Sequence, residues 1–178
     1  MTGVQTCALP ISGAGTLTHL TGEIYKRAVG LPDYAHIPYR GAGPGMNDLV
    51  GGHIPTMVFN ITGQGIELHK AGKIRIVGVA SPKRLDVLPD VPACAEFYPA
   101  IVAQLFTGLF APAGTPRSII DQIAKANSEV AGSAEFRKKL IDSGLEPVAD
   151  TPEEAGAVVQ AELRRLGPLA KEIGFKPE

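Results

Sequence analysis

The sequence has 178 residues, 44% of them hydrophobic, which is enough for one sizeable core or two small ones and predicts a globular protein. Its 17 Lys and Arg residues nearly balance its 18 Asp and Glu residues, so charge gives no argument for binding to nucleic acid or to an anionic membrane. No window approaches the roughly 18 consecutive apolar residues that cross a bilayer, and residues 1–12 lack the features of a secretory signal.

The N-terminal residues 1–11, MTGVQTCALPI, resemble the in-frame translation of a sequencing adapter. We therefore expect residues 1–11 to be a disordered artefact outside the fold, with the natural protein beginning upstream. The alternative is a genuine, disordered N-terminal segment. The two cysteines, Cys7 and Cys94, form no CxxC motif, so we expect neither a zinc site nor a disulfide framework.

The first half of the chain alternates helix and strand patterns. Apolar residues at a spacing of three to four predict a half-buried helix over residues 16–28. Strands are predicted at 35–39, 54–59 and 74–80, and short helices at 46–50 and 66–71. The run 74–80 has no polar alternation beyond Arg75, which is typical of a strand buried on both faces. This order predicts a layered α/β architecture with right-handed crossovers.

The second half begins with a proline-rich segment, 82–99, expected to be an extended surface excursion. A long strand is predicted at 101–110, a helix from Thr115-Pro116 to about residue 130, a shorter helix at 135–141 and a small strand at 146–148. Thr151 and Glu154 form a capping box that opens the last helix. The faces expected to point inward are Ile119, Ile120, Ile123 and Ala124 in the first of these helices and Ala155, Val159, Leu163, Leu166, Ala170 and Ile173 in the last.

Two glycine-rich turns, 12–19 and 39–47, lie at predicted connections from a strand to a helix. The start of a helix leaves about four amides unbonded and carries roughly half a positive charge, so it binds carboxylates without any Lys or Arg. In the first turn the hydroxyls of Thr16 and Thr18 are expected to add donors. The alternative is that these glycines only form tight turns. Arg40 could bind a carboxylate or pair with Asp48, and the sequence does not decide between the two.

Motifs of catalysis and cofactor binding are missing. The run 41–46 lacks the last glycine of GxGxxG, residues 71–74 lack the hydroxyl of a phosphate-binding loop, and neither GxSxG nor HExxH occurs. The histidines sit singly, without ligand spacing, and His36 is expected to be a hydrogen-bonded core residue. We predict no enzyme activity, no cofactor and no metal. The alternative is a small α/β enzyme acting on carboxylic acids, with a site assembled from distant residues.

Four blocks, in order, carry a family resemblance: GAGTLTHLTGE at 13–23, IPYRGAGPGMNDLVGG at 37–52, AGKIRIVGVASPKRLDVLPDVP at 71–92 and FAPAGTP at 110–116. They closely resemble the Bug family, the TctC-like substrate-binding proteins of tripartite tricarboxylate transporters. The resemblance implies a two-lobed, type II periplasmic-binding-protein-like α/β fold that is incomplete here. Residues 12–104 would be most of the second lobe. Residues 105–178 would be the hinge strand and C-terminal helices of the first lobe.

The resemblance also implies a function. The protein would capture a small organic acid, a di- or tricarboxylate, in the cleft between the lobes and deliver it to the membrane subunits of a tripartite transporter. It would be periplasmic and monomeric, with no nucleic-acid partner. The residues expected to face the ligand are Gly15, Thr16, Thr18, His19, Asn60 and Thr62. Family members often carry an acidic residue near Asn60, and its absence here disfavours an amino-acid ligand. Because half of the first lobe would be missing, we expect weak or no affinity.

Overall fold

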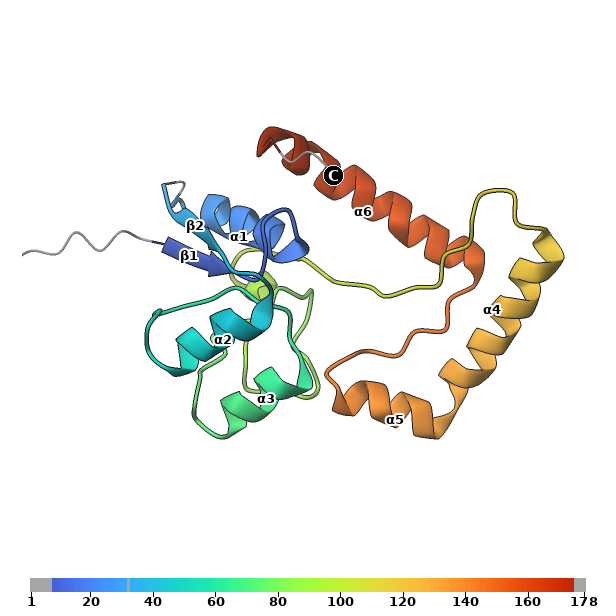
Figure 1. The fold of residues 1–178 in the computed structure, drawn as a ribbon, viewed down its shortest axis with the longest axis horizontal. Coiled ribbons are helices and arrows are strands. Elements are labelled where there is room, and N and C mark those ends of the chain that lie inside the picture. The colour runs from blue at the N-terminus through green and yellow to red at the C-terminus, as the bar shows by residue number, and fades with distance from the viewer. Residues whose placement is uncertain (1–7, 32, 175–178) are drawn as a thin grey trace, which may run out of the picture.

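The computed structural model describes residues 8–31 and 33–174 (Figure 1). Two short strands and three helices alternate in its first part: β1 (Ala8–Ile11), α1 (Leu17–Ala28), β2 (Ala35–Pro38), α2 (Ala42–Val50) and α3 (Gly63–Lys70). After a single 3₁₀ turn, η1 (Cys94–Glu96), three helices follow: α4 (Arg117–Gly132), α5 (Ala134–Asp142) and α6 (Pro152–Glu172). None of the described helices is long and apolar enough to span a bilayer.

β1 lies in the middle of a small parallel array. It pairs with β2 in the register Ala8↔Ala35 to Ile11↔Pro38, and on its other side Ile11 forms a parallel bridge with Val58. The Val58 amide donates to the Pro10 carbonyl oxygen at 2.8 Å. Ile11 is only 1% exposed. The expectation that residues 1–11 lie outside the fold is therefore wrong for residues 8–11, because these apolar residues occupy the central strand. Residues 1–7, including Cys7, lie outside the described part of the chain.

A second core lies beneath α3. Its buried members are Ile66, Ile76, Val79, Leu88, Val91 and Ala93. The main chain of Val79 ties the two ends of this region together, since its amide donates to Pro92 O at 3.0 Å and its carbonyl oxygen accepts from Cys94 N at 2.8 Å. The proline-rich segment is thus not a mere surface excursion, because three of its apolar side chains fill this core.

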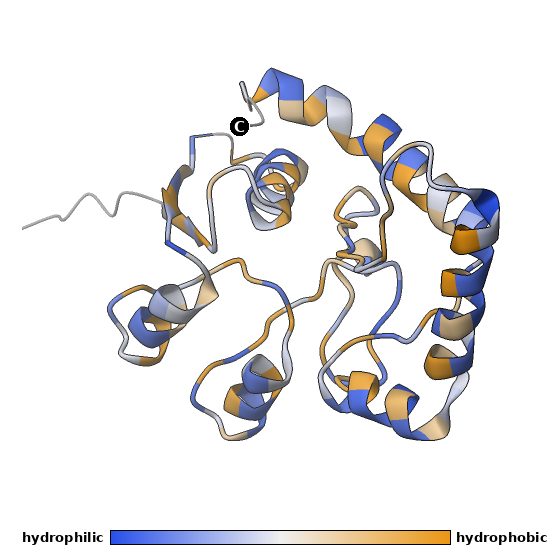
Figure 2. Ribbon diagram, turned by 45° about the vertical axis from the view of Figure 1, so that its right-hand side comes forward, coloured by the Kyte–Doolittle hydropathy of each residue, from blue (hydrophilic) through white to orange (hydrophobic). Residues whose placement is uncertain are grey.

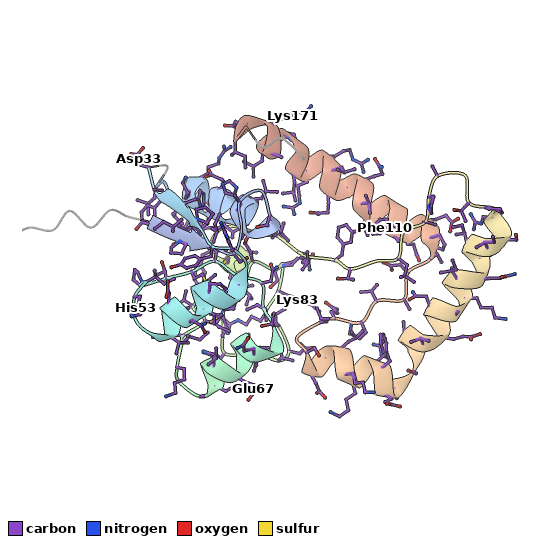
Figure 3. The ribbon with its side chains drawn as sticks, in the orientation of Figure 1. Asp33, His53, Glu67, Lys83, Phe110 and Lys171 are labelled. Carbon is purple, nitrogen blue, oxygen red and sulfur yellow. The ribbon has the colours of Figure 1, made fainter. Side chains whose placement is uncertain are left out.

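Several predicted strands are absent from the described residues. Segments 54–59 and 74–80 contribute single bridges at Val58 and Val79, and segments 101–110 and 146–148 contain no strand. A strand exists only when a neighbour supplies its hydrogen bonds, and here the neighbours are missing along most of each segment. The run 74–80 is also buried on one face only, since Val77 is 76% exposed. Phe110, likewise 76% exposed, stands on the extended segment between the two groups of helices (Figure 3).

The helices follow the sequence more closely. α1, α4, α5 and α6 begin and end within about two residues of their predicted limits, and the capping box of α6 is present, with Thr151 Oγ1 accepting from Glu154 N. α2 and α3 begin earlier than predicted. Gly41 has φ 94°, a left-handed conformation that suits glycine and lets α2 begin directly after it.

The three C-terminal helices pack sparsely. Ala131 is their only buried residue, and Leu163, on the expected core face of α6, is 59% exposed. Many apolar residues of these helices are exposed, among them Ile119, Val130 and Phe136, and Figure 2 shows hydrophobic positions recurring along all three helices. The expectation that their apolar faces point into a core is wrong for Ile119, Ile123 and Leu163, which are exposed. On the side of α6 that contacts α1, Leu166 and Ala170 are only half-buried. Helix α6 reaches the first part of the chain through an ion pair between Arg27 and Glu172, at 2.9 Å.

Candidate ligand-binding site

The parallel array brings three helix starts to one edge. α1 follows β1, α2 follows β2, and α3 follows the segment that bridges to β1 at Val58. Figure 1 shows that all three helices begin on the side turned toward α4–α6. The chain passes from β1 to β2 on one side and then to Val58 on the other, so the strand order reverses beside β1. Open α/β sheets bind ligands at such a reversal, beyond the carboxyl ends of the strands. The loops 12–16 and 60–62 flank this point.

A chain of hydroxyl groups closes the loop before α1. Thr16 Oγ1 donates to Gly13 O at 2.8 Å, and Thr18 Oγ1 lies 2.7 Å from Thr16 and 2.9 Å from Ser12 Oγ. Because each hydroxyl has one hydrogen, Thr18 must donate to Thr16 and Ser12 to Thr18. All three hydrogens are used inside the loop, and Thr18 is only 3% exposed. The Thr16 and Thr18 hydroxyls therefore hold the loop together, whereas we had expected them to offer donors to a ligand.

The amides at the start of α1 remain available. His19 N and Leu20 N donate to Thr16 O, but within the described residues the amides of Leu17 and Thr18 have no hydrogen-bond partner. The first turn of α1 carries no acidic side chain that could neutralise it. An anion placed there would meet free N–H groups and the positive end of the helix dipole. Leu17 was not among the predicted site residues because only its main chain takes part.

The side chain of His19 is hydrogen-bonded to the same loop. Its Nδ1 accepts a hydrogen bond from Gly15 N at 3.1 Å, and its ring meets the ring of His36 edge-on, with centroids 4.6 Å apart. Burial, followed by the nearby His36, lowers the pKa of His19 below its usual value, so the neutral ring is favoured. Two of the predicted ligand residues, Gly15 and His19, are thus bonded to each other.

The sequence indicated that the histidines sit singly, but the structure brings His19 and His36 together. Donor atoms of His19, Glu23 and His36 lie within 4.8 Å of one another, a set of residue types that metals use. Here a cation is already present, since Lys26 Nζ lies 2.9 Å from Glu23 Oε1. The same carboxylate oxygen lies 2.6 Å from His36 Nε2. The predicted role of His36 as a hydrogen-bonded inner residue is confirmed, although its Nδ1 is buried without a partner among the described residues.

Asn60 and Thr62 lie across the reversal point from the α1 loop, and both are exposed. Thr62 is the N-cap of α3, where its hydroxyl accepts from Gly65 N at 3.3 Å. The next amide, Gly63 N, donates to Ser143 O at 3.1 Å. The start of α3 is therefore partly occupied by the chain itself. The structure brings Asn60 and Thr62 to the same edge as Gly15 and Thr16, on loops that follow paired segments.

The start of α2 is open. Within the described residues the amides of Ala42 and Gly43 have no partner, and a Cβ added at Gly41 or Gly43 would meet no atom within 4 Å. Arg40 does not pair with Asp48, whose carboxylate instead accepts from the Tyr39 hydroxyl at 2.8 Å. That hydrogen bond, followed by one with His53, lowers the pKa of Asp48. Arg40 therefore remains exposed beside this helix start.

The family model described as "Tripartite tricarboxylate transporter family receptor" (TctC) matches residues 8–175. The chain belongs to this family. The resemblance of its sequence blocks to the Bug proteins is thereby confirmed. Among the curated relatives, the UPF0065 protein in the clcB-clcD intergenic region of Pseudomonas knackmussii is 31% identical over 160 residues, which cover 89% of this chain and 94% of the relative. Protein BugT of Bordetella pertussis is 29% identical, over 95% of this chain and 52% of BugT. The chain spans about half the length of most of the curated relatives it matches.

Two solved structures share the fold. R. palustris Rpa4515 with adipate matches 96% of this chain, with a TM-score of 0.80 and 28% identity. A TctC solute binding protein from Polaromonas, solved without ligand, matches 92% with a TM-score of 0.70 and 24% identity. The predicted periplasmic-binding-protein-like α/β fold is therefore confirmed. The chain covers 57% of each of these two structures.

Proposed function

We propose that this protein is an extracytoplasmic solute-binding protein that captures a small di- or tricarboxylate and delivers it to the membrane subunits of a tripartite transporter. Its membership of the TctC family supports this role, and the similar structure of Rpa4515 was solved with adipate, a dicarboxylate. The periplasm is the compartment in which such a protein would work, as a monomer. Residues up to 104 form most of one lobe, and residues 105–178 return to the other.

The single observation that carries the proposal is the free start of α1. Leu17 N and Thr18 N are unpartnered at the point where the strand order reverses beside β1. A carboxylate of the ligand binds there, with Gly15, Thr16, Thr18 and His19 shaping one wall and Asn60 and Thr62 the facing one. Main-chain donors read the geometry of a carboxylate group and need no basic side chain. We expect them to accept several organic acids of similar size.

The proposal is tested by following the amide signals of the ¹⁵N-labelled chain by NMR during titration with adipate. This measurement detects the weak binding expected from the sequence. The signals of Leu17 and Thr18 should shift and saturate, whereas adipamide, which has the same length but no charge, should leave them unchanged. Failure of adipate, succinate and citrate alike to move these signals would contradict the proposal. The ligand signals should stay unchanged on prolonged incubation, since a binding protein forms no product.

A variant isolates the main-chain donor. Leu17 is the first residue of α1, where proline is tolerated, and Thr16 before it has the extended conformation (φ −85°, ψ 172°) that a following proline requires. Leu17→Pro therefore removes one N–H and keeps the helix start. Adipate affinity should fall by about tenfold or more, the loss expected for one hydrogen bond to a charged group. Leu17→Ala, which loses the side chain and keeps the amide, should bind as the parent chain does.

A further inference from the structure

The hydrogen bond from Gly15 N to His19 Nδ1 joins two positions of one loop. Thr16 is the N-cap of α1, so Gly15 precedes the cap and His19 is the third helical residue. The side chain at the third position reaches back to a free amide, as the acidic residue of a capping box does. Gly15 has φ 71°, a conformation that only glycine adopts readily. The bond therefore fixes the turn that presents the Leu17 and Thr18 amides.

This bond requires a neutral imidazole. The donor is the Gly15 amide, so His19 Nδ1 must hold a lone pair and the ring proton must sit on Nε2. A second proton on the ring would place one N–H group against another and remove the bond. It would also put a positive charge in the first turn of a helix, where the dipole disfavours it.

The surroundings of His19 favour the neutral form. The ring faces His36 from β2, at a centroid distance of 4.6 Å, and the same side of α1 carries Glu23 and Lys26. Glu23 is the only negative group of this cluster, and its carboxylate is already shared by Lys26 and His36, at 2.9 and 2.6 Å. It therefore offers little further compensation for a charge on His19.

From this geometry we propose that His19 is a positioning residue whose protonation releases the Gly15 turn and weakens carboxylate binding at the start of α1. The inference rests on the proposed function for its ligand, but the switch itself lies within the loop. The ring does not act as a charge that attracts the ligand. It acts as a hydrogen-bond acceptor that holds the donors in place. The protein would then release its organic acid more readily in acidic surroundings than in neutral ones.

The switch is tested first without ligand. NMR would follow the Gly15 amide and the His19 ring between about pH 7.5 and about pH 5.5, the range in which histidines titrate. The Gly15 amide should move with the same midpoint as the His19 ring. In His19→Asn, whose Oδ1 stands close to the position of Nδ1 but cannot titrate, the Gly15 amide should be insensitive to pH. A Gly15 signal that ignores the protonation of His19 would overturn the inference while leaving the proposed function intact.

The second arm measures adipate affinity of the same proteins across this pH range. The parent chain should lose about threefold to tenfold in affinity as His19 takes up its proton, the size expected for one lost hydrogen bond. His19→Asn should show only the change caused by the titration of adipate itself, and His19→Ala should bind weakly throughout. An affinity that rises on protonation would show that His19 attracts the ligand by charge and would overturn the inference. His53→Asn, which alters an exposed histidine on the loop after α2, is the matched control. Its adipate affinity should depend on pH as that of the parent chain does.

Discussion

The guanidinium of Arg165 in α6 donates a hydrogen bond at 2.7 Å to the carbonyl oxygen of Val102, on the segment that leaves the first part of the chain. This bond, the ion pair between Arg27 and Glu172 and the bond from Gly63 N to Ser143 O are the polar links that join the C-terminal helices to the rest of the described chain. Surface links of this kind contribute little individually, and the apolar faces of α4–α6 are largely exposed.

The C-terminal helices should therefore open before the N-terminal core does. In native-state hydrogen exchange, amides of α4, α5 and α6 should lose protection first, and amides such as Val58 N and Val79 N last, because few buried apolar contacts hold the former. Arg165→Ala should speed exchange in α6, whereas Arg164→Ala, at the neighbouring exposed position, should have no such effect. Equal protection of both regions would contradict this prediction.

Ile76 and Val77 are adjacent and both apolar, but only Ile76 is buried, so they test how much burial contributes to stability. Ile76 is 8% exposed within the second core, whereas Val77 points outward. Ile76→Ala should lower the free energy of unfolding by about 2–5 kcal/mol through lost apolar contact and a residual cavity. Val77→Ala should change it by no more than about 0.5 kcal/mol. Chemical denaturation of both variants measures the difference, and equal losses would mean that segment 74–80 is buried on both faces after all.

Replacing Gly22 or Gly156 by alanine should change stability in opposite directions. A Cβ at Gly22 would lie 2.6 Å from His36 Cε1 and 3.2 Å from Leu9 Cδ2, and the His36 ring is held by its bond to Glu23. Gly22→Ala should therefore destabilise the protein by about 1–3 kcal/mol. Gly156 in α6 has nothing within 4 Å of such an atom, so Gly156→Ala should make α6 more stable by about 0.5–1 kcal/mol. The measurement is the free energy of unfolding for Gly22→Ala and helix protection for Gly156→Ala. A stabilising Gly22→Ala would show that the packing of α1 on His36 is looser than described.

Glu96 should make stability depend on acid pH. The hydrogen bonds from the Arg84 side chain, followed by the bond from Ala93 N, lower the pKa of Glu96 to about 2. The unfolded chain takes up this proton near 4.5, the ordinary value, so the stabilisation is complete above that pH and is lost as the pH falls toward 2. Glu96→Gln should remove this part of the acid dependence, and Arg84→Gln should reduce it. Denaturation curves at several acid pH values test this, and an unchanged dependence in Glu96→Gln would refute it.

The sequence by itself determined the helices. Thr151 and Glu154 located the start of α6, the spacing of Leu17, Leu20 and Ile24 located α1, and Gly144 marked the end of α5. These signals are local because the hydrogen bonds and caps of a helix join residues at most four positions apart. The glycine turns also indicated which loops lie at helix starts, and the order of the blocks indicated the family.

Only the tertiary structure decided the strands and the details of the site. Apolar runs at 54–59, 74–80 and 101–110 look like strands, but a strand needs a partner. Val58 has one at Ile11, whereas segment 101–110 pairs with no other strand among the described residues. The same long-range pairing of β1 and β2 brings His36 beside His19, across 17 positions of sequence. Whether the Thr18 hydroxyl is free or used within its loop depends on where Ser12 and Thr16 lie in space, and no sequence pattern encodes those positions.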